Sequence, residues 1–394
     1  MTPLFKKFLG INWILVLNML ALMAFGLYAI YTASYFREDP NLQIKWTQQL
    51  RWMIVGVPIF FAASLIDYKW IRWGAWLAYP LGIAGLIAVK MFGIEKSGAT
   101  SWLNLGGTSV QPSQFAIVSG IMLLAIVFGD LQRVAPIFRY PSLRLLLGGI
   151  LSAVPALMIL KEPDLGSAAV WGPLFVSLLL VGSIPFRYLI TLVLLVLCVV
   201  PVAYFFMLKP YQQKRIDTYI AMLTDGDFDV QADAWVPYHV RLAVGSAGFD
   251  GKGPESQKAP EQNTIHRTFF PADVAINDFI FGVIGEEFGF RGGLLLISGM
   301  TMLLLQSIFV AFYARDQLGR LLVVGIVAML FTHSFMNMGM SIILVPITGL
   351  PMPFVSYGGT FMVVTMFLMG MVQSVWVHRK TSPVKKGRGD HSLA

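Results

Sequence analysis

Charged residues are scarce in this chain of 394 residues. They make up 13% of the sequence, whereas hydrophobic residues make up 56% and the mean hydropathy is +0.69. An average soluble domain has roughly 25% charged residues. This composition excludes an ordinary soluble enzyme, because a soluble core could not bury so much apolar surface, and it indicates a protein whose solvent is lipid.

Cysteine is almost absent as well. The single residue, Cys198, lies inside an apolar run, so an intrachain disulfide is excluded and the loops must be ordered without covalent crosslinks. A cleaved signal peptide is not expected, because the first apolar run, residues 11–33, is too long for a signal-peptide core and no convincing small-residue cleavage site follows it. We expect this run to be retained as a membrane span.

The net charge of +8 does not indicate a nucleic-acid-binding protein. Basic residues beside membrane spans are expected of any membrane protein, and no basic, aromatic-rich binding module is visible. We therefore expect no nucleic acid among the partners.

Long apolar runs recur from end to end and predict an all-α integral membrane fold. A helix needs roughly 20 apolar residues to cross about 30 Å of hydrocarbon, and about ten runs approach this length. They are residues 11–33, 50–66, 70–92, 113–129, 143–160, 166–183, 186–207, 278–313, 320–345 and 358–378. The eighth run contains two acids and a glycine-rich step at 291–293, which predicts a broken or strongly tilted helix.

The distribution of Lys and Arg predicts the orientation of the spans. With the N-terminus placed inside, fifteen of the 29 basic residues fall in inner connections or tails, six in short outer connections, seven in one long outer connection and one within a span. Cytoplasmic segments carry the excess of basic residues. Both termini are therefore expected to be cytoplasmic.

One long connection, residues 208–277, separates the seventh and eighth spans and is expected outside the cytoplasm. It contains nine acids and seven bases. Long loops on a rigid scaffold usually carry function. We expect one polytopic domain over residues 1–378, followed by a disordered cytoplasmic tail at 379–394.

Asp278 is a candidate functional residue because it immediately precedes the apolar run that begins at Phe279. On the predicted topology its carboxylate lies at the outer lip of the membrane, near the depth at which a lipid-linked substrate presents its headgroup. Acids are also favoured at helix N-termini by the helix dipole and the free N–H groups. Position alone favours that second, structural interpretation.

Basic residues in the long connection are candidates for binding an anionic leaving group. Arg215 and Lys252 are the two that we select, and Lys258 is a third cation of the same loop. A pyrophosphate leaving group needs such donors, because negative charge develops on it as its bond breaks. Each of these residues is equally compatible with a solvated loop position.

Other charged residues lie within or beside predicted spans, where charge is costly and therefore suggests function. Glu286 and Glu287 follow Asp278 by roughly two helical turns and are expected to line the bundle interior, although structural hydrogen bonds between helices would explain them equally well. Glu162 and Asp164 follow the fifth span and are expected to cap the next helix.

Metal ligands are not indicated. The acids at 225, 227 and 229 resemble part of a calcium loop, but the glycine is misplaced and Val236 replaces the final glutamate. The other histidines show no metal-ligand spacing, and His333 and Asn337, one turn apart in the ninth span, are typical of hydrogen bonds between helices. We expect no metal bound by side chains.

Several motifs together resemble the SEDS family of bacterial cell-wall polymerases, the family of RodA, FtsW and SpoVE. The most specific match is PMPFVSYGGT at 351–360. The runs NDFIF at 277–281 and GEEFG at 285–289 are similar to the family's Asp-Phe-Ile-Phe and Glu-Glu-x-Gly patterns. Shorter matches fall in the family's order at 102–106, 111–113, 162–166 and 245–253.

The chain departs from the family pattern at a few positions. Gln114 and Ile117 stand where the family usually carries an acid and a lysine, and Ile276 precedes Asn277 where His-Thr is usual. These changes leave the expected fold intact. They keep open the possibility that the chain is a non-catalytic scaffold for a partner polymerase.

The resemblance implies a peptidoglycan glycosyltransferase that polymerises lipid II into glycan strands with inversion at the anomeric carbon. It implies that Asp278 is the base that deprotonates the 4-hydroxyl of the acceptor sugar, while polyprenyl pyrophosphate leaves. The predicted substrate-binding residues are Arg215, Lys252, Glu286, Glu287, Ser356 and Tyr357. The cofactor is left open, including a divalent cation such as Mg²⁺.

The resemblance also implies a location and a partner. Members of the family usually work in the bacterial cytoplasmic (inner) membrane with a class B penicillin-binding protein, which crosslinks the product. The segment Gly251-Lys252-Gly253 favours the RodA-like elongation branch over FtsW-like division. Besides the scaffold, a flippase for the lipid-linked precursor stays an alternative, because paired inward charges and broken spans also suit a transporter.

Overall fold

The computed structural model describes residues 3–35, 39–96, 99–106, 108–206, 210–224, 234–253 and 264–379. A long helix lies at each of the ten predicted positions: α2 (Trp13–Tyr35), α4 (Lys45–Leu65), α5 (Ile71–Phe92), α6 (Pro112–Gly129), α8 (Pro141–Lys161), α9 (Leu165–Val181), α10 (Phe186–Phe206), α15 (Ile280–Phe312), α16 (Gln317–Ser341) and α17 (Gly359–Val377). The observed ends differ from the predicted ends by at most five residues.

The helices have the length and composition of membrane spans. Among the described residues, seven helices are long and apolar enough to cross a membrane, and α9 is a shorter apolar helix. The predicted helical, multi-pass membrane fold is confirmed.

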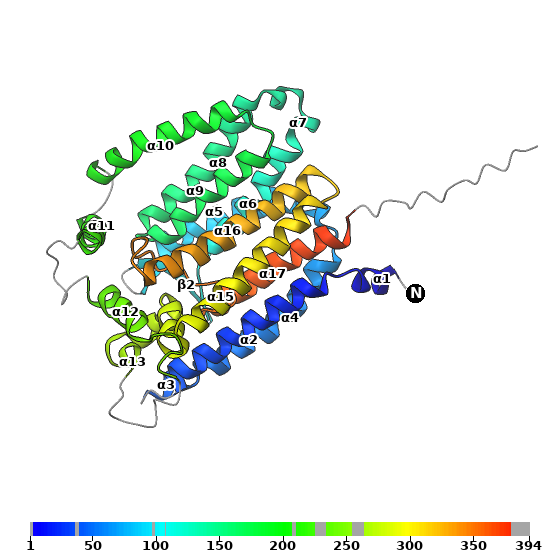
Figure 1. Cartoon of the computed structure of the whole chain (residues 1–394). Helices are drawn as coiled ribbons and strands as arrows, with labels where there is room; N and C mark the ends of the chain where they lie inside the picture. Colours follow the sequence, from blue (N-terminus) through cyan, green and yellow to red (C-terminus); the bar gives the residue numbers. More distant parts are fainter. Residues whose placement is uncertain are drawn as a thin grey trace, which may run out of the picture.

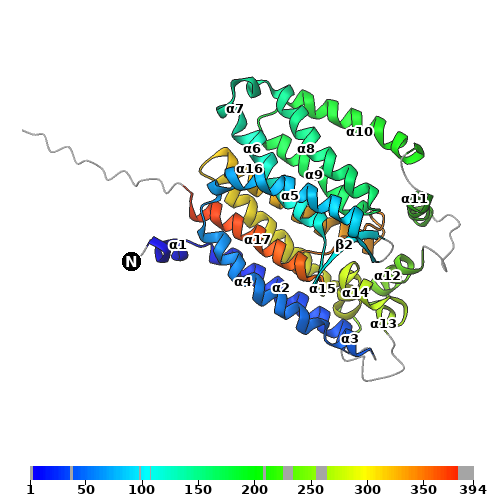
Figure 2. The same cartoon turned by 180° about the vertical axis from the view of Figure 1, so that it is seen from behind.

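The long helices run side by side, and short elements gather at their two ends (Figures 1 and 2). One end carries α3 (Pro40–Gln43) and the helices of the long connection, which are α11 (Pro210–Leu223), α12 (Trp235–Ser246), α13 (Ile265–Phe269) and α14 (Ala272–Asn277). The other end carries α1 (Pro3–Leu9) and α7 (Leu131–Val134). The predicted outer loop is therefore a layer of short helices at one end of the bundle.

Helix α6 lies at the centre of the bundle and α5 at its edge. In the most apolar window of each span, 89% of the residues are buried for α6 and 22% for α5. Close packing around α6 depends on small residues: a Cβ added to Gly120 would lie 2.3 Å from the indole of Trp171 on α9. Without a hydrophobic driving force between helices in lipid, such close contacts supply the packing energy.

A small antiparallel sheet, which the sequence analysis did not predict, connects α5 to α6. It contains β1 (Ile94–Lys96), β2 (Ala99–Leu105) and β3 (Thr108–Val110), in that order. In the second pair Leu103 lies opposite Val110, and Gly106, with φ +60°, begins the turn between the two strands. Only glycine adopts this conformation without strain.

The predicted interruption of the eighth span is present, but at a different residue. Gly289 has φ +62° and ψ −157° within α15, and the two glycines of the predicted step, Gly292 and Gly293, are helical and buried. A Cβ on Gly292 would lie 2.2 Å from the Cβ of Phe288. The step at 291–293 therefore provides close packing, and the break occurs at the end of the GEEFG motif.

Candidate active site

Asp278 lies between α14 and α15 at the end of the bundle that carries the short helices. Its N–H donates to the carbonyl of Val274 (3.0 Å), and its carbonyl accepts from Nδ2 of Asn337 on α16 (2.8 Å). Phe279, rather than the acid, occupies the N-cap position of α15. The backbone at Asp278 is therefore fixed from two sides, which also fixes the point from which its carboxylate projects.

The motif at 351–360 forms a mostly buried loop that binds the backbone just before Asp278. Oγ of Ser356 donates to the carbonyl of Asn277 (2.6 Å). The N–H of Tyr357 donates to the carbonyl of Ile276 in α14 (2.9 Å). Ser356 and Tyr357 therefore hold the segment that carries the acid, and direct contact of either with a substrate stays a prediction.

The phenol of Tyr357 is fixed by residues of α4. Its hydroxyl donates to Oε1 of Gln48 (2.7 Å), and Nζ of Lys45 lies 5.1 Å from its ring centroid. Burial, with a smaller effect of the nearby Asp273, raises the pKa of Tyr357, so the phenol stays a protonated donor. Lys45, which also pairs with Asp273 (3.3 Å), was not among the predicted site residues, because nothing in the local sequence connects it with a site so distant along the chain.

The loop before the motif brings a second element against Asp278. A Cβ added to Gly349, where φ is +68°, would lie 3.5 Å from Oδ2 of Asp278. One residue earlier, the carbonyl of Thr348 packs against the start of α9, where a Cβ on Gly166 would lie only 2.3 Å from it. Glycine at both places lets the loop pass between the acid and α9.

Glu162 and Asp164 lie at this same end of α9. Asp164 accepts a hydrogen bond from the N–H of Ser167 (2.9 Å), which confirms its predicted role as the cap of α9, and it accepts another from Nε2 of Gln111 (2.9 Å). Glu162 is only 7% exposed. Burial, followed by the charge of Asp164, raises the pKa of Glu162 to about 8, so this carboxyl group holds a proton at neutral pH.

We expect Glu162→Gln to flatten the pH dependence of thermal stability. The folded protein keeps a proton that the unfolded chain releases above its ordinary pKa of 4.5. Stability from this proton is therefore complete below about pH 4.5 and is lost as the pH rises through about 8. The glutamine variant carries no such proton and should gain stability at pH 8 relative to wild type, on the order of 5 kcal/mol, because each pKa unit of the shift is worth about 1.4 kcal/mol.

The measurement is the melting temperature of the detergent-solubilised protein from about pH 5 to pH 9. Across most of this range Glu162 is protonated in the folded protein and ionised in the unfolded chain. Wild type should lose stability over this range more steeply than Glu162→Gln. Parallel curves for the two proteins would contradict the raised pKa of Glu162.

Gln114 and Ile117, the two departures from the family pattern, are both buried on α6. Among the described atoms, neither polar atom of the Gln114 amide has a hydrogen-bond partner. A neutral pair avoids the desolvation cost of a buried ion pair. Helix α6 therefore carries no charged side chain at the two positions where the family usually has an acid and a lysine.

A glycine-rich stretch of the long connection, residues 248–253, fills the break in α15. We call it the glycine segment. The carbonyls of Glu286 and Glu287 lose their usual helical donors at the break, and the N–H groups of Lys252 and Gly253 donate to them instead (2.9 Å each).

The same segment also accepts hydrogen bonds from beyond the break. The N–H groups of Phe290 and Arg291, which follow Gly289, donate to the carbonyls of Gly248 (3.1 Å) and Phe249 (3.2 Å). Backbone polar groups need such partners near hydrocarbon. The break in α15 is therefore closed by backbone pairing with the long connection between α10 and α15.

Glu286 and Glu287 are fully buried beside this segment. Nζ of Lys252 lies 2.6 Å from Oε1 of Glu286, and Nδ1 of His266 lies 2.8 Å from Oε2. Oε1 of Glu287 lies 3.4 Å from Nε2 of His266 and 3.1 Å from a guanidinium nitrogen of Arg267. The two acids are thus paired with the long connection between α10 and α15, and their contact with a substrate stays a prediction.

Arg215, the other predicted cation, lies on α11, and its side chain is outside the described part of the structure. Helix α11 reaches the loop that follows α16. The hydroxyl of Tyr219 donates to the carbonyl of Leu344 (2.8 Å). The helix that carries Arg215 is therefore tied to the same loop that later passes Asp278.

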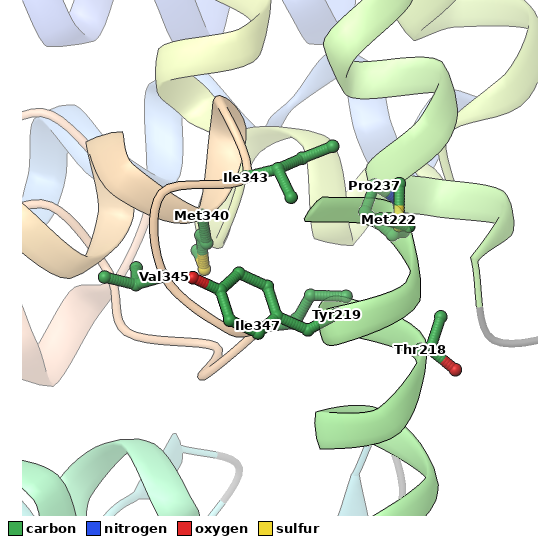
Figure 3. A pocket seen from close by; sticks show the side chains of 8 residues that line it. All are labelled: Thr218, Tyr219, Met222, Pro237, Met340, Ile343, Val345 and Ile347. Atoms are coloured by element: carbon green, nitrogen blue, oxygen red, sulfur yellow. The ribbon is translucent and has the colours of Figure 1, made fainter. Parts of the chain in front are cut away.

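An apolar pocket lies between α11 and this loop (Figure 3). Met222 contributes from α11, and Ile343 and Ile347 contribute from the loop. Ile347 is two residues before Gly349, whose Cα lies beside the carboxylate of Asp278. The loop after α16 therefore lines the apolar pocket and, two residues later, passes the candidate acid.

Several predictions lie outside the described residues: the acids at 225, 227 and 229, Lys258, and the tail from residue 380 onward. Within the described ranges, no group of three or more His, Cys, Asp or Glu side chains lies close enough to hold a metal ion.

These features define a class of protein: a polytopic membrane protein that holds a carboxylate at one end of its bundle, between a buried motif loop and a layer of short helices. The family model described as cell cycle protein, which groups FtsW, RodA and SpoVE, matches residues 12–381. The chain belongs to this family, which the motifs had indicated.

Known relatives match along almost their whole length. The peptidoglycan glycosyltransferase MrdB of Escherichia coli K12 is 28% identical over 93% of each chain. The probable peptidoglycan glycosyltransferase FtsW of Geobacter metallireducens is 30% identical over 94% of this chain and 96% of its own. A solved chain from a peptidoglycan synthase complex has a TM-score of 0.69 and 23% identity, and the match covers 93% of this chain and 97% of that one. This structural likeness supports the fold.

Proposed function

We propose that this protein is a peptidoglycan glycosyltransferase that polymerises lipid II into glycan strands. The observation that carries the proposal is Asp278, whose backbone is fixed by α14 and α16 at the lip of the bundle. Membership of the family and the names of the relatives support the same activity.

In the proposed reaction Asp278 takes the proton from the 4-hydroxyl of the acceptor sugar. The oxygen attacks the anomeric carbon of the donor from the face opposite the leaving group, so the configuration inverts. The bond from that carbon to the pyrophosphate oxygen breaks, and polyprenyl pyrophosphate leaves with the electron pair. A general base must lie within hydrogen-bond reach of the proton it accepts, directly or through one water.

The surroundings of Asp278 suit the two ends of a lipid-linked donor. The pocket between α11 and the loop after α16 offers apolar contacts for the prenyl chain. Arg215, on the same helix, is our candidate for the pyrophosphate, because a guanidinium can donate two parallel hydrogen bonds to such an anion.

We place the protein in the elongation branch, where a class B penicillin-binding protein crosslinks the strands. Relatives named RodA and FtsW both match, at 25% and 30% identity, so this choice rests on the Gly-Lys-Gly sequence of the glycine segment. The partner is supported by the structural likeness to a chain of a peptidoglycan synthase complex.

We further propose that the protein lies in the bacterial inner membrane with both termini cytoplasmic and the short-helix layer outside. In a variant without Cys198, a cysteine at Thr224, which is exposed after α11, should react with an impermeant thiol reagent in intact spheroplasts. A cysteine at Val134, which is 78% exposed after α6, should react only after permeabilisation. The reverse pattern would overturn this orientation.

The experiment that tests the activity uses purified wild-type protein with lipid II in two assays. One resolves polymer on a gel, and the other measures flipping of the lipid in liposomes. A polymerase makes polymer in the first assay. Flipping without polymer would favour a transporter, and inactivity in both assays would favour a scaffold that depends on a partner polymerase.

A further inference from the structure

The pairing between His266 and Glu286 closes a loop that carries Asp278. Glu286 follows Asp278 on α15, and His266 precedes it on α13, twenty residues before Glu286. Oε2 of Glu286 accepts from both the N–H (2.9 Å) and Nδ1 (2.8 Å) of His266. The two ends of the segment 266–286 are therefore joined through one carboxylate, and Asp278 lies between them.

Glu286 can make this connection only while its charge is balanced. Its side chain is fully buried, and its Oε1 accepts from the N–H of Ile265 (2.7 Å) as well as from Nζ of Lys252 (2.6 Å). A buried carboxylate without a cation carries a large desolvation penalty. Lys252 supplies a cation 2.6 Å from one carboxylate oxygen, and Nδ1 of His266 lies 2.8 Å from the other.

Lys252 is itself held in place by backbone bonds. Its N–H donates to the carbonyl of Glu286 (2.9 Å), so the residue contacts Glu286 through both its backbone and its side chain. Its side chain is 29% exposed, whereas that of Glu286 is fully buried. The ammonium is therefore partly exposed to solvent, and it is paired with an acid of α15.

The second acid extends the connection to another helix. Arg267, the residue after His266, donates to Oε1 of Glu287 (3.1 Å) and to the carbonyl of Thr32 on α2 (3.2 Å). The cluster therefore joins α13, α15, α2 and the glycine segment around the stretch that carries Asp278.

From this geometry we propose that Lys252 is a positioning residue: by neutralising Glu286 it holds α13 and α14, and hence Asp278, in the reactive place, and it is not a ligand of the pyrophosphate. The catalytic part of this inference rests on the proposed function. It replaces the role expected from the sequence, in which Lys252 contacts the leaving group directly.

The test is a double-mutant cycle on the full-length protein with lipid II as the substrate. Lys252→Met removes the cation and should lower kcat by about 10- to 100-fold with the KM for lipid II nearly unchanged, because a displacement of about 1 Å at the reacting atoms can cost about 10²-fold. Glu286→Gln in the same chain removes the charge that needed balancing and should restore part of kcat, because the amide oxygen still accepts hydrogen bonds on one side whereas the amide nitrogen cannot replace the second oxygen. Lys90→Met, at an exposed lysine of α5, is the matched control and should leave both constants unchanged.

A pyrophosphate ligand predicts the opposite pattern. Lys252→Met would then raise the KM for lipid II, and Glu286→Gln would not rescue it. Either result overturns the positioning role.

Hydrogen exchange separates this inference from the proposed activity. In Lys252→Met, the amides of residues 264–277 should exchange at least tenfold faster than in wild type, and the double variant should exchange more slowly than Lys252→Met, because one accepting oxygen remains and no buried charge is left unbalanced. Unchanged exchange in Lys252→Met would overturn the positioning role whatever the polymer assay gives. If exchange changes as expected but wild type makes no polymer, the structural role of Lys252 stands and only the proposed polymerase function is refuted.

Discussion

Replacing Asp278 by asparagine is expected to abolish polymerisation of lipid II while the protein still inserts and folds. The amide keeps the size of the carboxylate, and the hydrogen bonds of Asp278 with Val274 and Asn337 use backbone atoms. A general base contributes about 10² to 10⁴ in rate. A purely structural aspartate at a helix end would cost only about 0.5 to 2 kcal/mol when replaced. The readout is polymer formed by the purified variant.

Asp273→Asn is the matched control, because it removes a carboxylate from the same short stretch of chain. Asp273 is 67% exposed at its side chain and pairs with Lys45. Exposed ion pairs contribute about 0 to 1 kcal/mol. We expect this variant to polymerise at close to the wild-type rate.

Polymer formed by Asp278→Asn at a rate comparable with wild type would refute the proposed mechanism. The base would then have to be sought elsewhere, first at Glu286 or Glu287. Both of those acids are buried and paired with cations of the outer loop, so either would have to leave its partner before it could accept a proton.

The helical bundle could be predicted because lipid imposes a simple rule on the sequence. A span must be long, apolar and internally hydrogen-bonded, and each predicted run contains a helix. Capping by Asp164 was equally local, because a cap depends on residues only a few positions apart. These two features, the spans and the cap at Asp164, were predicted correctly, whereas Glu162, also expected to cap α9, ends α8 instead.

The small sheet and the site of the break in α15 were harder to predict. The strands are only three to seven residues long, too short for a clear alternating pattern. The break falls at Gly289 because the glycine segment, distant in sequence, supplies the replacement hydrogen bonds there. The glycines at 292 and 293 carried the stronger local signal, yet they pack within the helix.

Contacts around the candidate site could not be derived from spacing. The sequence identified Asp278, Lys252 and Glu286 separately, but nothing in it showed that the last two lie 2.6 Å apart. The contribution of Gly349 was also hidden, because it depends on a fold that brings this glycine against Asp278.

Replacing Gly251 by alanine should have the largest effect of any glycine substitution in the glycine segment. Gly251 has φ +79°, and an added Cβ would lie 2.4 Å from the carbonyl oxygen of Glu287 and 2.5 Å from the backbone nitrogen of Gly289. Alanine in this conformation costs about 1 to 2 kcal/mol, and overpacking against backbone adds about 1 to 3 kcal/mol. We expect the segment to separate from α15 and polymerisation to fall at least tenfold.

Gly248→Ala distinguishes the effect of the collision from the effect of the backbone conformation. Gly248 also has a positive φ, +63°, but an added Cβ would meet nothing within 4 Å. This variant should lose only the conformational part, about 1 to 2 kcal/mol, and keep most of its activity. Limited proteolysis of the two variants in detergent reports the separation directly: cleavage near residue 250 should accelerate in Gly251→Ala and stay close to wild type in Gly248→Ala. Equal cleavage and equal activity in both would mean that the tight contact between the outer loop and the break in α15 does not hold Asp278 in place.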